Sequence, residues 1–456
     1  MGRFAPMLPE IILTVGGTIL MMVAAFAGRR GSGLTSWLAV ALLLGATVAL
    51  IGPPSHAGPV FDGLFTADLF ASFGKAIMFP AAAVAIIAAH GWFEREHEHG
   101  SEYAVLILFS AIGMSVMVSA SSLVSLYVGL ELQSLAAYVL ASYRRTDDRS
   151  AEAGLKYFVL GALASGILLY GISLLYGFTG TMNFNGLAAA FAREAPSLGL
   201  LFGLVFVLAG LAFKASVVPF HMWTPDVYEG APTPVTAFFA SAPKVAAVLL
   251  ATRVCLEALG PATDAWRQIV IFAALASIFL GAVAAFGQTN IKRLLAYSSI
   301  NNVGFALIGL AAAGPHGASS VLFYMAVYVV MTLGAFLCVL WMRAPDAGRR
   351  VKERAQVTAA LRRPFGRGAP HPEGVGPDEQ QRVGERLLVA REALQRDERG
   401  EQRPATRAAP LAVAVHGPHD PGQHGGRLHH VGVPDLVERE AAPLPREARH
   451  DRARHA

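Results

Sequence analysis

The chain has 456 residues, of which 54% are hydrophobic and 15% are charged, and its formal net charge is +5. This composition and a positive mean hydropathy exclude an ordinary soluble domain and indicate a polytopic membrane protein. The two cysteines, Cys255 and Cys338, lie in apolar runs without metal-ligand spacing. They indicate neither a disulfide framework nor a zinc or iron-sulfur site.

Apolar runs of about twenty residues, the length that crosses a bilayer, recur along the first three quarters of the chain. They predict an all-α polytopic membrane protein with about 11 transmembrane helices. The first run follows one basic residue, Arg3, and lacks a convincing cleavage site, so we interpret it as a retained span. The predicted spans cover residues 8–28, 35–52, 72–92, 103–120, 122–143, 153–178, 198–220, 233–258, 266–288, 291–313 and 317–342.

Arginine and lysine collect on one side of these spans, which predicts the orientation of the chain. By the positive-inside rule that side is cytoplasmic, and the N-terminus lies outside. The acidic connection between the third and fourth spans carries little weight in this rule. The basic residues concerned are Arg29, Arg30, Arg144, Arg145, Arg149, Lys292, Arg293 and those from Arg343 onward.

Residues 211–234 contain a lysine and several prolines at the end of an apolar run. Lys214 lies at membrane depth, where a charge costs roughly 2.5 to 3.5 kcal/mol and usually faces a bundle interior or a water-filled cavity. Pro219 then breaks the helix, and a broken helix is tolerated there only where protein or water satisfies the backbone. The stretch therefore predicts a polar cavity with a titratable amine at the break.

Further polar groups lie within the neighbouring predicted spans. Glu131 has Tyr127 one turn before it and Tyr138 two turns after it on the same helical face. Lys244 follows Pro243 within the next span, and His221 lies just past the predicted break. Each charge alone is compatible with snorkelling or a structural ion pair, but the series favours a functional role.

Such a series is suited to proton transfer. Burial lowers the pKa of a lysine and a nearby carboxylate raises it again. At about 7 Å and an effective dielectric near 20, the attraction is roughly 2.4 kcal/mol, close to two pKa units. Carrying a charge against ~180 mV costs about 4 kcal/mol, so several coupled sites are expected.

Four motifs carry a resemblance to a known family. The sequence resembles the antiporter-like membrane subunits of respiratory complex I, the proton-translocating NADH:quinone oxidoreductase, over residues 1–342. The wording Trp-Thr-Pro-Asp-Val-Tyr-Glu-Gly is more similar to subunit N than to its sister subunits. The motifs are Gly-Leu-Glu-Leu-Gln-Ser-Leu around Glu131, Glu152–Tyr157, Phe213–Pro232 and Gln288–Ser299.

The resemblance implies roles for individual residues. Glu131 is the carboxylate of a proton-transferring pair, Lys214 the lysine at the broken helix, and Lys244 the central relay lysine. His221 is a relay or hydration partner. The other implied residues are Glu152 and Lys156, which shape the cytoplasmic mouth and the contact with a neighbouring subunit, and the accessory polar groups Tyr297, Ser298 and Ser299 of the second half-channel.

The resemblance also implies the surroundings of the chain. It predicts a bacterial inner-membrane protein whose partners are the lipid bilayer and other membrane-arm subunits, with no nucleic acid. NADH, FMN, iron-sulfur clusters and quinone are expected on partner subunits, and no cofactor on this chain. Two alternatives stay open: a cation/proton antiporter subunit, for which further intramembrane carboxylates would be expected, and a non-transporting membrane scaffold.

The chain departs from the family after residue 342. The family has fourteen helices with two inverted five-helix repeats, whereas residues 343–456 contain 20 arginines, eight histidines and one lysine. This polar segment has too little apolar surface to fold and is expected to be disordered. We interpret it as an out-of-frame product of a GC-rich gene, with a basic tail for anionic lipid or nucleic acid as the alternative.

Overall fold

A computed structural model describes residues 5–51, 60–61, 63–96, 100–193 and 196–342. The predicted polar tail, residues 343–456, lies outside the described residues. The α-helices are α1 Leu8–Ala27, α2 Ser32–Ala49, α3 Leu69–Glu96, α4 Glu102–Ser119, α5 Leu123–Ala141, α6 Asp148–Thr179, α7 Phe184–Arg193, α8 Leu198–Ala215, α9 Trp223–Gly230, α10 Thr233–Ala240, α11 Ala242–Arg253, α12 Thr263–Phe286, α13 Ile291–Ala312 and α14 Gly314–Trp341. Short turns complete them: η1 Ala5–Met7, η2 Gly28–Gly31, the π-helical η3 Val254–Ala258 and η4 Gly260–Ala262.

Within the described residues, 11 helical segments are long and apolar enough to cross a membrane. This number confirms the predicted all-α membrane fold. The seventh span differs in its end, because α8 stops at Ala215 rather than near residue 220. Two short helices, α7 and α9, lie between spans and were not predicted.

The eighth span is also interrupted, which the sequence analysis did not predict. α10 ends at Ala240 and α11 begins at Ala242, with Ser241 between them at φ −108° and ψ −96°. Pro243 has no N–H and its ring conflicts with the carbonyl four residues earlier. The continuous apolar composition concealed this break, although Pro at the second position of a new helix is favourable.

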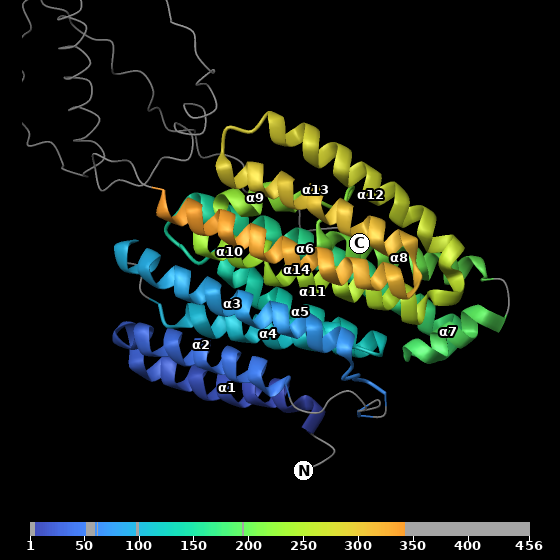
Figure 1. The fold of residues 1–456 in the computed structure, drawn as a ribbon, viewed down its shortest axis with the longest axis horizontal. Helices are drawn as coiled ribbons and strands as arrows, with labels where there is room; N and C mark the ends of the chain where they lie inside the picture. Colours follow the sequence, from blue (N-terminus) through green and yellow to red (C-terminus); the bar gives the residue numbers. More distant parts are fainter. Residues whose placement is uncertain (1–4, 52–59, 62, 97–99, 194–195, 343–456) are drawn as a thin grey trace, which may run out of the picture. The chain divides into compact units, whose positions relative to one another are not determined.

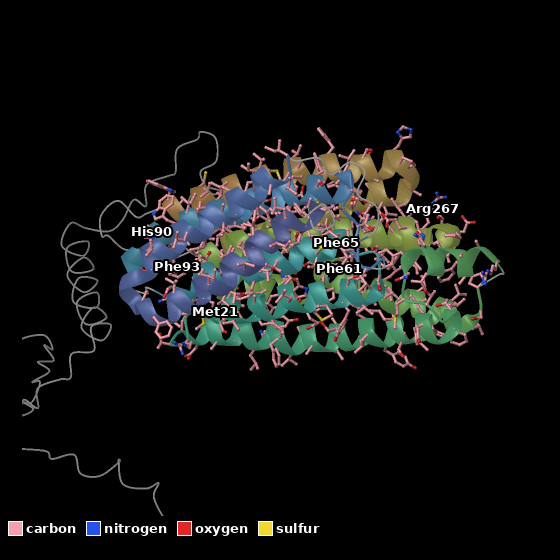
Figure 2. The ribbon with its side chains drawn as sticks, turned by 90° about the horizontal axis from the view of Figure 1, so that it is seen from below. Met21, Phe61, Phe65, His90, Phe93 and Arg267 are labelled. Atoms are coloured by element: carbon pink, nitrogen blue, oxygen red, sulfur yellow. The ribbon has the colours of Figure 1, made fainter. Side chains whose placement is uncertain are left out.

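The broken segments lie inside the bundle, and the outer helices face lipid. In the most apolar 18-residue stretch of the span Thr233–Ala258, 94% of the residues are buried within the protein, against 28% in that of the first span. Figure 1 shows α1 and α2 on one flank and α12 on the opposite flank. Figure 2 shows side chains projecting from the outer faces, among them the exposed Met21 of α1. The broken backbone is therefore shielded from hydrocarbon, as a membrane requires.

Two glycines bring α4 and α5 into close contact. A Cβ on Gly113 would lie 2.4 Å from the backbone nitrogen of Gln133, and one on Gly129 would lie 2.9 Å from that of Met117. Ser122 caps the start of α5 by accepting a hydrogen bond from the Val124 N–H at 3.3 Å, which favours helix initiation. This packing fixes the face of α5 that carries the polar residues of the site.

Candidate functional site

α8 ends inside the bundle, and its last turn carries Lys214. Ser216 adopts a left-handed conformation at φ 62° and ψ 41°, and Pro219 offers no N–H to continue the helix. The lysine is only 7% exposed. Its Nζ donates hydrogen bonds to the hydroxyl oxygens of Ser134 at 2.6 Å and Tyr138 at 3.1 Å. The predicted amine at the helix break is therefore present, and hydroxyl groups hold it.

Glu131 acts on Lys214 from a distance. Its charge is the carboxylate charge that Lys214 experiences, but no ion pair joins the two among the described residues. The Oε1 atom of Glu131 is buried and has no hydrogen-bond partner there. Ser134 lies one helical turn after Glu131 on α5 and accepts a hydrogen bond from Lys214, a contact that was not predicted from the sequence.

Lys244 meets the end of α8 from the first turn of α11. The side chain is 1% exposed, and its Nζ donates to the carbonyl oxygen of Ala215 at 3.2 Å. It also lies 5.5 Å and 5.9 Å from the ring centroids of Trp223 and Tyr228. A helix C-terminus and aromatic faces both stabilise a cation. The two predicted lysines are thus brought to the same helix end.

The connection between α8 and α9 is fixed by hydrogen bonds rather than left open. The indole Nε1 of Trp223 donates to the carbonyl of Phe213 at 2.9 Å. The Thr224 hydroxyl donates to the Ser216 hydroxyl at 2.6 Å. These contacts satisfy polar groups that the break would otherwise leave unpaired in a buried setting.

His221 lies in this connection and is half-buried. Its Nδ1 atom is buried without a hydrogen-bond partner among the described residues, and the charge of Lys244 acts on it. The structure therefore places the histidine near the relay lysine. Its role as a relay or hydration partner stays a prediction.

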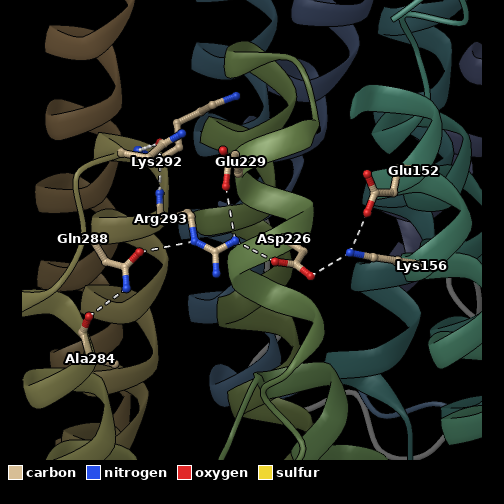
Figure 3. A network of polar contacts seen from close by, with 9 residues as sticks. Glu152, Lys156, Asp226, Glu229, Ala284, Gln288, Lys292 and Arg293 are labelled. Atoms are coloured by element: carbon tan, nitrogen blue, oxygen red, sulfur yellow. Dashed lines mark hydrogen bonds and ion pairs between the residues drawn. The ribbon is translucent and has the colours of Figure 1, made fainter. Parts of the chain in front are cut away.

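Glu152 and Lys156 belong to a chain of ion pairs that crosses from α6 to α13 (Figure 3). The Lys156 Nζ lies 2.7 Å from Glu152 Oε1 and 3.0 Å from Asp226 Oδ2. Arg293 contacts the other Asp226 oxygen at 2.6 Å and Glu229 Oε2 at 3.2 Å. These side chains line a cavity of about 250 Å³.

Asp226 is the centre of this network. Burial alone would raise the pKa of its carboxyl, but hydrogen bonds from Arg293 and Lys156 hold that pKa below its ordinary value. The carboxyl therefore stays ionised and joins two basic side chains from different helices. The sequence analysis assigned no role to Asp226, although it lies in the motif that carried the resemblance.

The three accessory residues on α13 have different surroundings. The Ser299 hydroxyl lies 2.7 Å from the Tyr328 hydroxyl of α14. Ser298 accepts hydrogen bonds from the Asn302 amide, through its carbonyl oxygen at 2.8 Å and its hydroxyl at 3.4 Å. Tyr297 is half-buried, and no hydrogen bond joins it to these groups among the described residues. Of the three residues, only Ser299 forms a hydrogen bond with the buried Tyr328 among the described residues.

Comparisons with known proteins show which family the chain resembles. A family model described as NADH:quinone oxidoreductase/Mrp antiporter, TM, matches residues 120–357. An NADH-quinone oxidoreductase subunit N from Rhizorhabdus wittichii is 62% identical over 355 residues, 78% of this chain and 73% of that protein. Another from Sphingopyxis alaskensis is 59% identical, over 78% of this chain and 74% of that protein.

The chain belongs to the subunit N family of NADH-quinone oxidoreductases. Among solved structures, a chain of respiratory complex I from Thermus thermophilus with bound aureothin is 31% identical with a TM-score of 0.61, covering 73% of this chain and 70% of that chain. A chain of the Mrp complex from Dietzia sp. shares the fold at 22% identity and a TM-score of 0.63, over 73% of this chain and 64% of its own length. The family region includes Glu131, Lys214, His221 and Lys244.

A second buried charge pair lies before residues 120–357, the region matched by the family model. Lys75 Nζ lies 2.6 Å from Glu10 Oε1, with the two side chains 2% and 6% exposed. The Ser115 hydroxyl also donates to Glu10. This pair was not predicted from the sequence, in which only Glu131 was identified as a carboxylate within a span. The available signal was a charge near the start of each apolar run.

A further ion cluster, also unassigned from the sequence, lies where α3 begins and α11 ends. Arg253 is buried and donates to both oxygens of Asp68 at 2.7 and 2.8 Å. It also donates to Glu257 at 2.7 Å and lies 5.0 Å from the ring centroid of Phe70. The cluster fastens α3, which lies outside the matched family region, to the end of the eighth span.

Proposed function

We propose that this chain is a membrane-arm subunit of a bacterial NADH-quinone oxidoreductase and that it translocates protons through the buried lysines at the end of α8. Electron transfer from NADH to quinone takes place on partner subunits, which carry the FMN, the iron-sulfur clusters and the quinone. Other membrane-arm subunits and the lipid bilayer surround the chain. Family membership supports this assignment, and the buried lysines supply the chemistry.

The observation that carries the proposal is the way in which Lys214 and Lys244 are held. Both are nearly fully buried, and among the described residues neither forms an ion pair. Their partners are hydroxyl oxygens and a backbone carbonyl. A buried ammonium without a counter-ion is costly. Because charges inside a protein are screened less than in water, its protonation responds strongly to a distant charge.

Glu131 supplies that distant charge. For an assumed separation of about 7 Å and an effective dielectric near 20, its attraction for the Lys214 ammonium would be roughly 2.4 kcal/mol. Neutralising or moving the carboxylate favours release of the lysine proton, and restoring it favours uptake. Moving a charge against ~180 mV costs about 4 kcal/mol, which exceeds this single coupling. Lys244, at the same helix end, provides the second site in series, and His221 is a relay or hydration partner beside it.

The network around Asp226 is the cytoplasmic entrance in this proposal. Glu152, Lys156 and Arg293 line its cavity of about 250 Å³, and α9 leads from Asp226 to the helix break. Arg149 and Arg293 lie at the starts of α6 and α13 and line this one cavity. The positive-inside rule assigns both helix starts to the same side. This supports a cytoplasmic position for the cavity and a periplasmic N-terminus.

Lys214→Ala tests the proposal. In inverted vesicles that carry the assembled complex, we expect proton uptake per NADH to fall strongly, because a short neutral side chain cannot hold a proton at the break. The matched control removes another buried lysine together with its partner, in the double variant Glu10→Gln and Lys75→Met. We expect the control to pump at the wild-type yield, and a wild-type yield from Lys214→Ala would overturn the proposal.

A further inference from the structure

The hydroxyl of Tyr228 is a buried polar group without a partner, next to Lys244. Tyr228 is 0% exposed, and its hydroxyl forms no hydrogen bond among the described residues. The Lys244 Nζ lies 5.9 Å from the centroid of its ring. Buried polar groups are nearly always hydrogen-bonded, so the groups packed around Tyr228 determine what its hydroxyl can do.

The hydroxyls of Ser299 and Tyr328, which are hydrogen-bonded to each other, are close neighbours of Tyr228. Ser299 is near enough to act on the Tyr228 hydroxyl as a side-chain hydrogen-bonding group, and Tyr328 acts on it electrostatically. Tyr328 is 2% exposed, and its hydroxyl donates to the carbonyl of Ala240 at 2.8 Å. Because the single hydroxyl proton of Tyr328 is donated to Ala240, Ser299 must be the donor in its 2.7 Å hydrogen bond with Tyr328. A lone pair of Ser299 is then free to accept from Tyr228.

The geometry points to a hydroxyl relay, Tyr228–Ser299–Tyr328, that carries protons from Lys244 toward α13 and α14, an inference that rests on the proposed function. Its members come from three helices, α9, α13 and α14, and meet beside the break between α10 and α11. The relay therefore connects the lysine series with the polar residues of α13.

The proton balance of the step is simple. The Lys244 ammonium becomes a neutral amine as a bridging water, or a change in the lysine rotamer, delivers its proton to the Tyr228 oxygen. Tyr228 passes its own proton to Ser299, and Ser299 passes one to Tyr328. The Tyr328 hydroxyl then turns away from the Ala240 carbonyl and releases its own proton to a water molecule. Each oxygen gains one proton and loses one, so one proton moves and no other bond changes.

Tyr228→Phe tests the relay with little structural disturbance. The variant keeps the ring that faces Lys244 and removes only an unpartnered hydroxyl, which is expected to be neutral or stabilising for the fold. Tyr103→Phe is the matched control. Tyr103 is likewise buried with an unpartnered hydroxyl, but it lies on α4 against the rings of Phe93 and Tyr143.

The readouts are proton uptake per NADH in inverted vesicles and the amount of assembled complex. We expect Tyr228→Phe to lower the yield at least fivefold with full assembly, Tyr103→Phe to match the wild type, and Ser299→Thr to retain more activity than Ser299→Ala. Equal yields from Tyr228→Phe and Tyr103→Phe, or a loss that only follows reduced assembly, would overturn the relay. Lys214→Ala in the same vesicles separates the two proposals, because its failure to lower the yield rejects the proposed function itself.

Discussion

Two buried lysines of this protein are held in opposite ways. Lys75 on α3 contacts the carboxylate of Glu10 directly at 2.6 Å and lies 4.8 Å from the ring centroid of Phe65. Lys214 on α8 is held by the hydroxyls of Ser134 and Tyr138, and its nearest functional carboxylate acts from a distance. Lys75 is in a direct ion pair with Glu10, called the closed pair below. Lys214 and Glu131, which form no ion pair among the described residues, are called the open pair.

The difference shows how a lysine and a glutamate can either lock two helices together or exchange a proton. In the closed pair, releasing a proton means breaking a direct contact and leaving a buried charge uncompensated, which costs several kcal/mol. In the open pair, the hydroxyls can remain in place while the charge on Glu131 changes. We therefore assign Lys75 and Glu10 to holding α1 on α3, and Lys214 and Glu131 to proton exchange.

The largest effect is expected from breaking the closed pair on one side only. Lys75→Met leaves the Glu10 carboxylate buried and unpaired, so we expect about 3 to 5 kcal/mol of destabilisation and little assembled complex on native gels. Adding Glu10→Gln should restore most of the assembly. If the single variant assembles as well as the double variant, the pair is not a structural lock.

A smaller effect is expected from removing the distant charge of the open pair. Glu131→Gln keeps the shape and loses roughly 2.4 kcal/mol of attraction for Lys214, so proton uptake per NADH should fall while assembly is retained. Glu131→Asp should keep part of the activity. Equal pumping by the two variants would mean that the charge at this position is irrelevant.

The smallest effect is expected at the network around Asp226. Because its partners hold the pKa of this carboxyl below the ordinary value, its stabilisation is present above the ordinary carboxyl pKa and is lost as the pH falls through the lower folded value. The side chain is 38% exposed, so solvent screening limits the contribution to about 1 kcal/mol. Asp226→Asn should reduce the acid-induced loss of thermal stability, and an unchanged pH profile would contradict this.

Much of the fold and part of the site could be predicted from the sequence. Apolar length identified the spans, and Lys214 followed by Pro219 identified a buried charge at a helix break. Glu10 and Lys75 carry the same kind of signal, but they lie within a few residues of the start of their runs. There a charge looks like an ordinary residue at the membrane edge. Only the packing of α1 on α3 shows that the two are buried together.

The hydroxyl groups could not be predicted for a different reason. Ser134 and Tyr228 are ordinary residues in apolar helices, and their roles depend on which groups tertiary packing brings opposite them. The break at Ser241 was hidden because the apolar composition continues through it. Sequence patterns thus locate the charges, whereas the structure locates the neutral groups that hold them.

The most direct measurement replaces Lys214 by a cation that cannot release its proton. Arginine keeps the positive charge, but its pKa is so high that the side chain does not release its proton in a protein. We predict that Lys214→Arg, in vesicles with a wild-type amount of assembled complex, shows the same strong loss of proton uptake per NADH as Lys214→Ala. A wild-type proton yield from Lys214→Arg would show that a fixed charge suffices at the end of α8, and it would contradict proton exchange by this lysine.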